Sequence, residues 1–95
     1  MSARAVSKNS AREILTEREL EYLSLVAMGF KNKEIAVILS VTKSTVKKTL
    51  EKVFQKTFAK DRTSAVTIAF VHNLLNMHTL NKINKKYNLK KSEIF

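Results

Sequence analysis

The stretch "NKEIAVILSVTKSTVKKTLEKVFQKT", residues 32–57, contains two apolar helical repeats with a short break around Ser40. Within residues 32–39, apolar side chains recur at three- and four-residue spacings, which predicts a short helix. Thr42 follows the break and is a favourable helix cap, so a second helix is predicted at 43–57. Two short helices joined by a tight turn form a helix-turn-helix.

The predicted helix 43–57 has an apolar and a polar side when its residues are placed at 100° intervals. Its apolar side should pack on the preceding helices. Its polar side carries groups that can pair with base edges in the major groove of DNA: lysine with guanine, glutamine with adenine, glutamate with cytosine, and serine with several bases. The predicted base-reading residues are Ser44, Lys47, Lys48, Glu51 and Gln55.

Lysines also occur at the starts of both predicted helices, where a cation opposes the helix dipole by ~0.3–1 kcal/mol. A phosphate docked on the free N–H groups beside these lysines would reverse that penalty. For any single lysine, a solvated surface is the simpler explanation. Residues 31–62, however, carry nine cations against three acids, whereas the charges before them nearly balance. Lys33, Lys43 and, beside the polar side, Lys52 are therefore predicted to contact phosphates.

The flanking segments predict two more helices. Thr16 followed by Glu19 is a capping box for a helix at 17–28, which Gly29 is suited to end. A fourth helix is predicted at 63–76, and it is apolar on two sides. A surface helix needs only one apolar stripe for its own core, so the second stripe predicts a homodimer interface. That stripe consists of Ile68, Val71 and Leu75.

The composition restricts the fold class. Proline is absent and glycine occurs once in 95 residues, so the turn residues of an all-β fold are missing and an all-α protein is expected. The chain length suits one four-helix, bundle-like domain, placed at 15–76. Residues 1–14 are interpreted as a polar tail. Residues 77–95 are interpreted as a basic extension, in which one further helix is considered although no capping signal is recognised.

The formal net charge of +10 points first to nucleic acid and second to an anionic membrane surface. No apolar run approaches the roughly 18–20 residues of a membrane span, and the N-terminus lacks the apolar segment of a signal peptide. A cytoplasmic, nucleoid-associated protein is therefore expected.

No chemistry-bearing motif is recognised. The sequence has no cysteine, and His72 and His78 have no clustered acidic partners, so no metal site is predicted. No Gly-rich phosphate loop or nucleophile–base arrangement occurs either. We therefore predict neither enzymatic activity, nor a cofactor, nor a small-molecule ligand.

Residues 15–66 resemble the LuxR/FixJ/GerE-type helix-turn-helix domain. The matching elements are LTxRE at 15–19, Gly29, NKEIA at 32–36, TVK at 45–47, Lys56 and DR-T-x-A at 61–65.

The resemblance implies a bacterial DNA-binding domain that dimerises through its fourth helix and places its third helix in the major groove of two inverted half-sites. It implies base-facing positions for Lys47, Lys48 and Glu51. It further implies that four residues contact or adjoin phosphates, namely Asn32, Lys33, Thr45 and Lys56.

Several positions depart from the family pattern. Lys31 replaces a Ser or Thr cap, so Asn32 is expected to cap the second helix. Thr57-Phe58 replaces a Leu-Gly pair, so the third helix is expected either to run on or to stop in a different geometry. Thr49 replaces a common histidine and Glu51 a frequent basic residue, so the operator sequence cannot be borrowed.

The family often joins this domain to a receiver or signal-binding domain, and only 14 residues precede it here. We expect a stand-alone regulator of the short GerE type, or else the severed C-terminal domain of a larger regulator. Two other functions fit parts of the sequence. A sigma-factor region-4 module would bind promoter DNA and RNA polymerase, but the second apolar stripe argues against it. An interaction module that antagonises another regulator would have little need of Lys47 and Lys48.

Overall fold

The computed structural model describes residues 15–89, which form five α-helices and no strand. The helices are α2 (Glu17–Ala27), α3 (Asn32–Leu39), α4 (Lys43–Thr57), α5 (Arg62–Val71) and α6 (Met77–Tyr87). The prediction of an all-α domain is confirmed. The segments 1–14 and 90–95, with the predicted tail and the end of the basic extension, lie outside the described residues.

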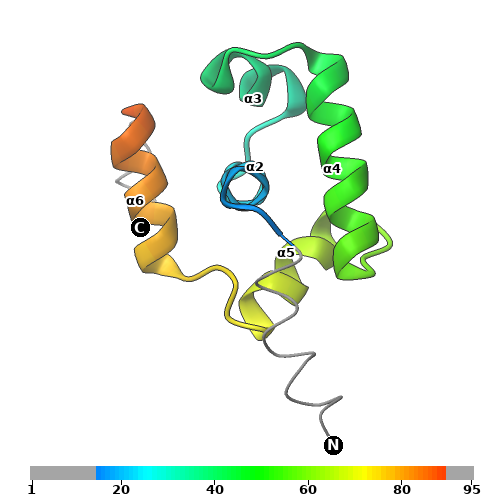
Figure 1. Cartoon of the computed structure of the whole chain (residues 1–95). Coiled ribbons are helices and arrows are strands. Elements are labelled where there is room, and N and C mark those ends of the chain that lie inside the picture. Colours follow the sequence, from blue (N-terminus) through cyan, green and yellow to red (C-terminus); the bar gives the residue numbers. More distant parts are fainter. Residues whose placement is uncertain (1–14, 90–95) are drawn as a thin grey trace, which may run out of the picture.

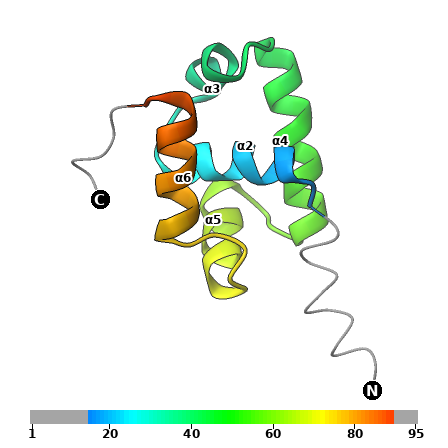
Figure 2. The same cartoon turned by 60° about the vertical axis from the view of Figure 1, so that its left-hand side comes forward.

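Helix α2 occupies the centre of the fold (Figures 1 and 2) and packs against α4, α5 and α6. It begins with the predicted capping box: the Thr16 hydroxyl accepts the Glu19 N–H at 3.0 Å, and the Glu19 carboxylate accepts the Thr16 N–H at 2.9 Å. Gly29 follows the helix with a φ of 94°, a conformation that glycine adopts at little cost. The first helix thus begins and ends on the signals that predicted it.

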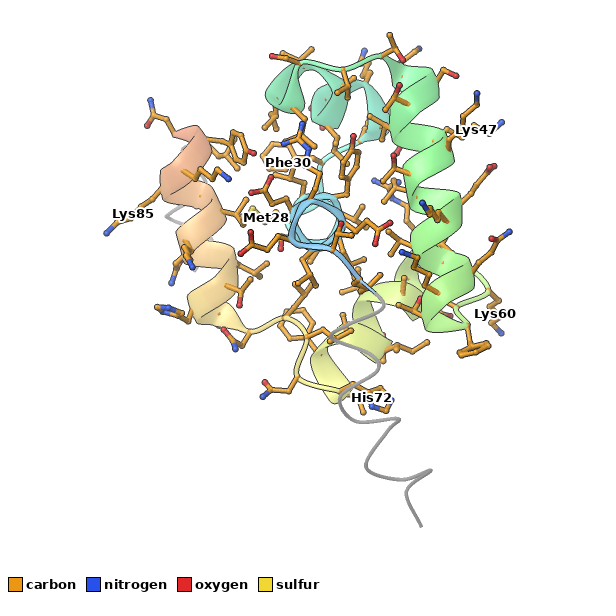
Figure 3. All side chains as sticks on the ribbon, in the orientation of Figure 1. Met28, Phe30, Lys47, Lys60, His72 and Lys85 are labelled. Carbon is orange, nitrogen blue, oxygen red and sulfur yellow. The ribbon has the colours of Figure 1, made fainter. Side chains whose placement is uncertain are left out.

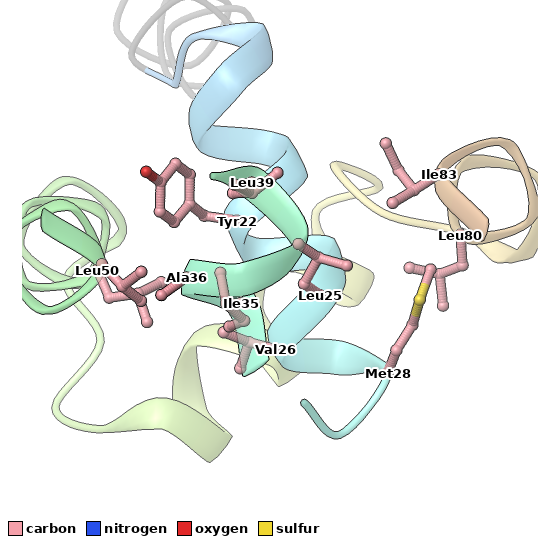
Figure 4. Close-up of a cluster of buried hydrophobic side chains, with 11 residues drawn as sticks. Tyr22, Leu25, Val26, Met28, Ile35, Ala36, Leu39, Leu50, Leu80 and Ile83 are labelled. Carbon is pink, nitrogen blue, oxygen red and sulfur yellow. The ribbon is translucent and has the colours of Figure 1, made fainter. Parts of the chain in front are cut away.

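The apolar interior has two neighbouring parts. The first joins α2, α3, α4 and α6 and contains Tyr22, Leu25 and Ile35 (Figure 4). The second joins α2, α4 and α5 with the segment after α5, and contains Leu23, Val53 and Leu75. Because α2 and α4 contribute to both parts, the orientation of α4 depends on packing along its whole length.

The helix-turn-helix is present with the predicted bounds. Helix α3 ends at Ser40, whose φ of 57° and ψ of 47° turn the chain sharply. The Thr42 hydroxyl then accepts the Thr45 N–H at 3.0 Å and caps α4. The whole turn occupies the three residues between α3 and α4.

The predicted fourth helix, about 63–76, begins within one residue of the observed start at Arg62, but its predicted C-terminus is wrong. Helix α5 ends at Val71, and Asn73 adopts a left-handed φ of 60°. The Leu74 N–H then donates to the Ala69 carbonyl at 2.7 Å, and Leu75 is buried to 1 % exposure. The helical spacing of the apolar residues was misleading, because the chain folds back to place these leucines in its own core.

A fifth helix, α6, follows this turn. Asn76 caps it by accepting the Thr79 N–H at 2.9 Å, and the predicted helix 63–76 hides this signal because it includes Asn76. Leu80 and Ile83 are buried against the rest of the core at 3 % and 7 % exposure. The basic extension therefore contains the further helix that was considered, and this helix is part of the packed domain.

A polar cluster joins α6 to α2. The Glu21 carboxylate accepts hydrogen bonds from Lys86 and, at 2.7 Å, from the Tyr87 hydroxyl. Burial alone raises the pKa of Glu21, but the hydrogen bonds from Lys86, Tyr87 and Arg18 outweigh it and lower the pKa. Arg18 also donates to the Leu39 carbonyl at 3.2 Å and so connects the cluster to α3.

Among the described helices, none is long and apolar enough to cross a membrane.

Replacing Leu80 by alanine tests whether α6 belongs to the cooperative fold. The substitution removes a buried side chain of the core, so we expect it to lower the free energy of unfolding by about 2–5 kcal/mol in urea denaturation. Lys82→Ala, on the exposed side of the same helix, is the matched control and should change it by less than about 0.5 kcal/mol. Equal stability of the two variants would show that α6 contributes no packing.

Candidate nucleic-acid interface

Helix α4 separates its apolar and polar residues cleanly. Val46, Leu50 and Val53 are buried at 0 %, 2 % and 0 % exposure. On the other side, Lys47 points away from α2 (Figure 3). The structure brings all the predicted base-reading residues onto the exposed surface of this one helix: Ser44, Lys47, Lys48, Glu51 and Gln55.

The N-terminus of α4 has the properties of a phosphate-binding end. Lys43 and Thr45 are both exposed, and no acidic residue occurs in the first turn. The Thr42 hydroxyl donates to the Thr45 hydroxyl at 3.0 Å, which leaves the Thr45 proton available to a ligand. An anion here would meet backbone N–H groups, a hydroxyl donor and a cation together.

The start of α3 is built differently from the expectation. Lys31, not Asn32, is the residue that precedes the first turn, and its backbone N–H donates to the Glu34 carboxylate at 2.7 Å. A lysine side chain cannot accept the N–H groups of the first turn, so the Glu34–Lys31 bond is the half of a capping box that forms here. Asn32 is the first helical residue, and the prediction that it caps α3 is wrong.

Asn32 instead helps to fix α3 relative to α5. The side-chain oxygen of Asn32 accepts a hydrogen bond from Arg62 at 2.7 Å, and the same guanidinium donates to the Phe30 carbonyl at 2.6 Å. The Asn32 NH₂ group is not used in that bond and can still donate to a phosphate. Sequence reasoning recognised Arg62 as part of a motif without assigning it this role.

Lys56 is paired inside the domain. Its ammonium group lies 3.0 Å and 3.2 Å from the two carboxylate oxygens of Glu19 on α2. Burial alone raises the pKa of Glu19, but hydrogen bonds from the Thr16 backbone and from Lys56 outweigh it and lower the pKa. A phosphate would have to compete with this carboxylate. Lys33 and Lys52, in contrast, are exposed.

Helix α4 ends at Thr57, the predicted bound, and does not run on in the absence of the family's glycine. Phe58 stops it in the left-handed conformation, with φ 60° and ψ 28°. Its N–H donates to the Gln55 carbonyl at 3.2 Å, and the Ala59 N–H donates to the Phe54 carbonyl at 2.9 Å. This is the helix ending that glycine normally makes, formed here by an aromatic residue.

Two of the three predicted dimer residues share an exposed surface. On α5, Val71 is 73 % exposed and Ile68 is partly exposed. Leu75 belongs to the core of its own chain and is not available to a second copy.

Comparison with known families identifies this domain. Residues 13–69 match the model of the bacterial regulatory proteins of the luxR family. The chain belongs to the luxR family. The matched segment covers α2 to α4 and most of α5, and α6 lies beyond it. A luxR-type helix-turn-helix is a DNA-binding domain of transcription regulators and is not catalytic.

Curated relatives of this luxR-family chain include the response regulator protein VraR of Staphylococcus aureus, Staphylococcus epidermidis and Staphylococcus saprophyticus. Each is 43 % identical over 63 residues, which is 66 % of this chain and 30 % of the relative. The chain thus spans less than a third of the length of these relatives, and the similarity concerns the helix-turn-helix domain.

Glu19→Gln tests whether the carboxylate that binds Lys56 also holds α4 on α2. The pKa of Glu19 is lower in the folded state than its ordinary value of 4.5, so the ionised carboxylate stabilises the fold fully above pH 4.5. This stabilisation is lost as the pH falls through the lower pKa of the folded state. At pH 7 we expect a loss of about 1–3 kcal/mol in the free energy of unfolding. The difference from wild type should shrink as the pH falls below 4.5. A deficit independent of pH would contradict the ionic explanation.

Proposed function

We propose that this protein is a sequence-specific regulator of transcription that inserts α4 into the major groove of double-stranded DNA. The observation that carries the proposal is the exposed side of α4. Its lysines, glutamate, glutamine and serine are the side chains that pair with base edges, and the opposite side is anchored in the core. The luxR-family match supports the same conclusion.

Glu51 distinguishes base reading from simple charge attraction. An exposed carboxylate among Lys47, Lys48 and Lys52 weakens the attraction of α4 for a polyanion. It is useful where it accepts a hydrogen bond from the amino group of cytosine. Glu51 therefore lowers the nonspecific affinity of α4 for DNA. A sequence-specific protein gains a base contact in return, whereas a nonspecific protein would gain nothing.

Phosphate contacts would fix the position of α4 in the groove. The start of α4, with Lys43 and Thr45, and the start of α3, with Asn32 and Lys33, present donors at two separate helix ends. Arg62 holds the second of these ends by bonding to Asn32 and to the Phe30 carbonyl. The same region thus combines positioning donors with a base-reading helix, as expected of a DNA-binding domain acting in the cytoplasm.

Dimerisation through α5 would place two copies of α4 on one duplex. Ile68 and Val71, three residues apart on α5, supply an apolar surface that a second copy can bury. Two-fold symmetry then requires inverted half-sites, with centres about one helical turn, or 10–10.5 base pairs, apart.

Base-reading and phosphate-contacting residues should respond differently to substitution. Lys47→Ala or Glu51→Ala should change the preferred sequence and cost about 1–3 kcal/mol for each lost base contact. Lys33→Ala should instead weaken all duplexes alike and flatten the salt dependence of binding by about one unit. Selection from a random duplex pool, followed by titrations at several salt concentrations, measures both effects. Uniform, sequence-independent losses in all three variants would show that α4 does not read bases.

Val71→Glu tests the dimer. The side chain is 73 % exposed within one chain, so the substitution should leave the helical content intact while placing two carboxylates in the interface. Sedimentation equilibrium should then report a monomer. Val37→Glu, at a position on α3 that is 79 % exposed, is the control and should remain dimeric. A dimeric Val71→Glu protein would exclude this surface.

A further inference from the structure

Helix α6 lies outside the segment that matches the luxR family, which ends at residue 69. It runs along the domain from the side of α5 toward the side of α3 (Figures 1 and 2). Leu80 and Ile83 pack it into the core, and Tyr87 is its last residue. Tyr87 therefore lies toward the end of the domain that contains the helix-turn-helix.

The Tyr87 hydroxyl joins two charged side chains of α2. It donates its hydrogen to the Glu21 carboxylate at 2.7 Å, and its oxygen accepts a hydrogen bond from Arg18 at 3.2 Å. A hydroxyl has one hydrogen and two lone pairs, so it can form both bonds at once. The same Arg18 nitrogen lies 3.2 Å from the same Glu21 oxygen. The three groups form a closed triangle of hydrogen bonds, in which each fixes the position of the other two.

Arg18 carries this arrangement to α3. Its second guanidinium nitrogen donates to the Leu39 carbonyl at 3.2 Å, and Leu39 is the last residue of α3. The last carbonyls of a helix have no partner within the helix, so they accept such donors readily. A guanidinium is planar, with its donors in fixed directions. The contacts with Tyr87 and Glu21 at one nitrogen therefore also orient the nitrogen that meets Leu39.

The end of α3 in turn affects the start of α4. Only three residues separate Leu39 from Lys43, the first residue of α4, and one of them is the left-handed Ser40. So short a turn has little slack, and a shift of Leu39 would move the N-terminus of α4. That N-terminus carries the proposed phosphate donors Lys43 and Thr45. Groups that recognise a ligand must be held within about 0.5 Å of their productive positions.

We infer that Tyr87 is a positioning residue for DNA recognition, which acts through Glu21 and Arg18 on the end of α3. The hydroxyl acts without contacting DNA. The opposite end of α3 is held in a comparable way, since Arg62 donates to the side chain of Asn32. The inference rests on the proposed function and assigns a part in it to α6, beyond the segment that matches the family.

A purely structural role of the same cluster would be to attach α6 to α2. Lys86 binds the other oxygen of Glu21, and Leu80 and Ile83 are buried in the core, so α6 has attachments that do not use the Tyr87 hydroxyl. Removal of the hydroxyl alone should therefore leave α6 in place and release the side chain of Arg18, which is 48 % exposed.

Tyr87→Phe separates positioning from attachment, because it keeps the ring and the charge and removes only the hydroxyl. The affinity for the duplex that the wild-type protein selects should fall by about 3-fold or more. The affinity for a scrambled duplex of the same length should stay unchanged, since nonspecific binding depends on phosphate attraction and no charge is removed. A loss of stability alone would lower both affinities alike, so the ratio of the two affinities is the measurement.

Tyr22→Phe is the matched control. It removes the only other tyrosine hydroxyl of the chain, which belongs to none of these hydrogen bonds, and it keeps the ring that lies 5.8 Å from the Arg18 guanidinium. The ratio of affinities should not change. A fall in the ratio equal to that of Tyr87→Phe would overturn the assignment to Tyr87.

Arg18→Ala tests the route of the effect. This variant should lower the ratio at least as much as Tyr87→Phe does. In the Arg18→Ala background, Tyr87→Phe should cause no further loss, because both changes remove the same contact with Leu39. Fully additive losses would show that the hydroxyl does not act through Arg18 and would overturn the inference.

Hydrogen exchange in the protein without DNA tests the structural step separately. The Ser40 and Val41 N–H groups donate to carbonyls of α3 at 3.2 Å and 2.9 Å, so their exchange reports on the end of this helix. Tyr87→Phe should accelerate it and leave the exchange of Ala65 in α5 unchanged. Unchanged exchange at Ser40 and Val41, or an unchanged ratio of affinities, would overturn this inference alone. A wild-type protein that selects no sequence would overturn the proposed function as well.

Discussion

The burial of α2 between α4, α5 and α6 is the constraint on which the rest of the structure depends. Leu23 and Leu25 are fully buried and belong to different parts of the core, so α2 is fixed from opposite sides. Helix α4 can present a polar surface only because its own apolar residues are held against this central helix. The ion pair between Glu19 and Lys56 joins the first turn of α2 to the last turn of α4.

The positive charge of the domain is divided between two roles. Lys56, Lys86 and Arg62 are engaged with other parts of the chain, where they connect helices that are distant in sequence. The lysines of the proposed interface on α3 and α4 lie exposed at the surface. A net charge of +10 therefore overstates the charge available to DNA, and a lysine's role depends on its neighbours in space.

The end of α4 departs from the residue preference of its helix ending. Glycine would make the turn from α4 to α5 without strain, whereas Phe58 makes it with a left-handed backbone and an exposed ring. The carbonyls at the end of α4 still have hydrogen-bond partners, because the N–H groups of Phe58 and Ala59 donate to carbonyls of the last turn. Position 58 is therefore one where a local preference for glycine is broken, and no packing of the ring within the described part of the chain explains it.

The sequence by itself determined what depends on near neighbours: the capping box of α2, the bounds of α3 and α4, and the polar side of α4. These follow from helical periodicity and from bonds between residues three or four apart. Only the tertiary structure decided where α5 ends. From the sequence, Leu75 could pack either against a second chain or in the core of its own chain, and the structure places it in its own core. It also decided the pairing of Lys56 with Glu19, 37 residues away, and the packing of α6 on α2. Contacts between distant residues depend on how the helices meet in space, and periodicity within one helix carries no information about that.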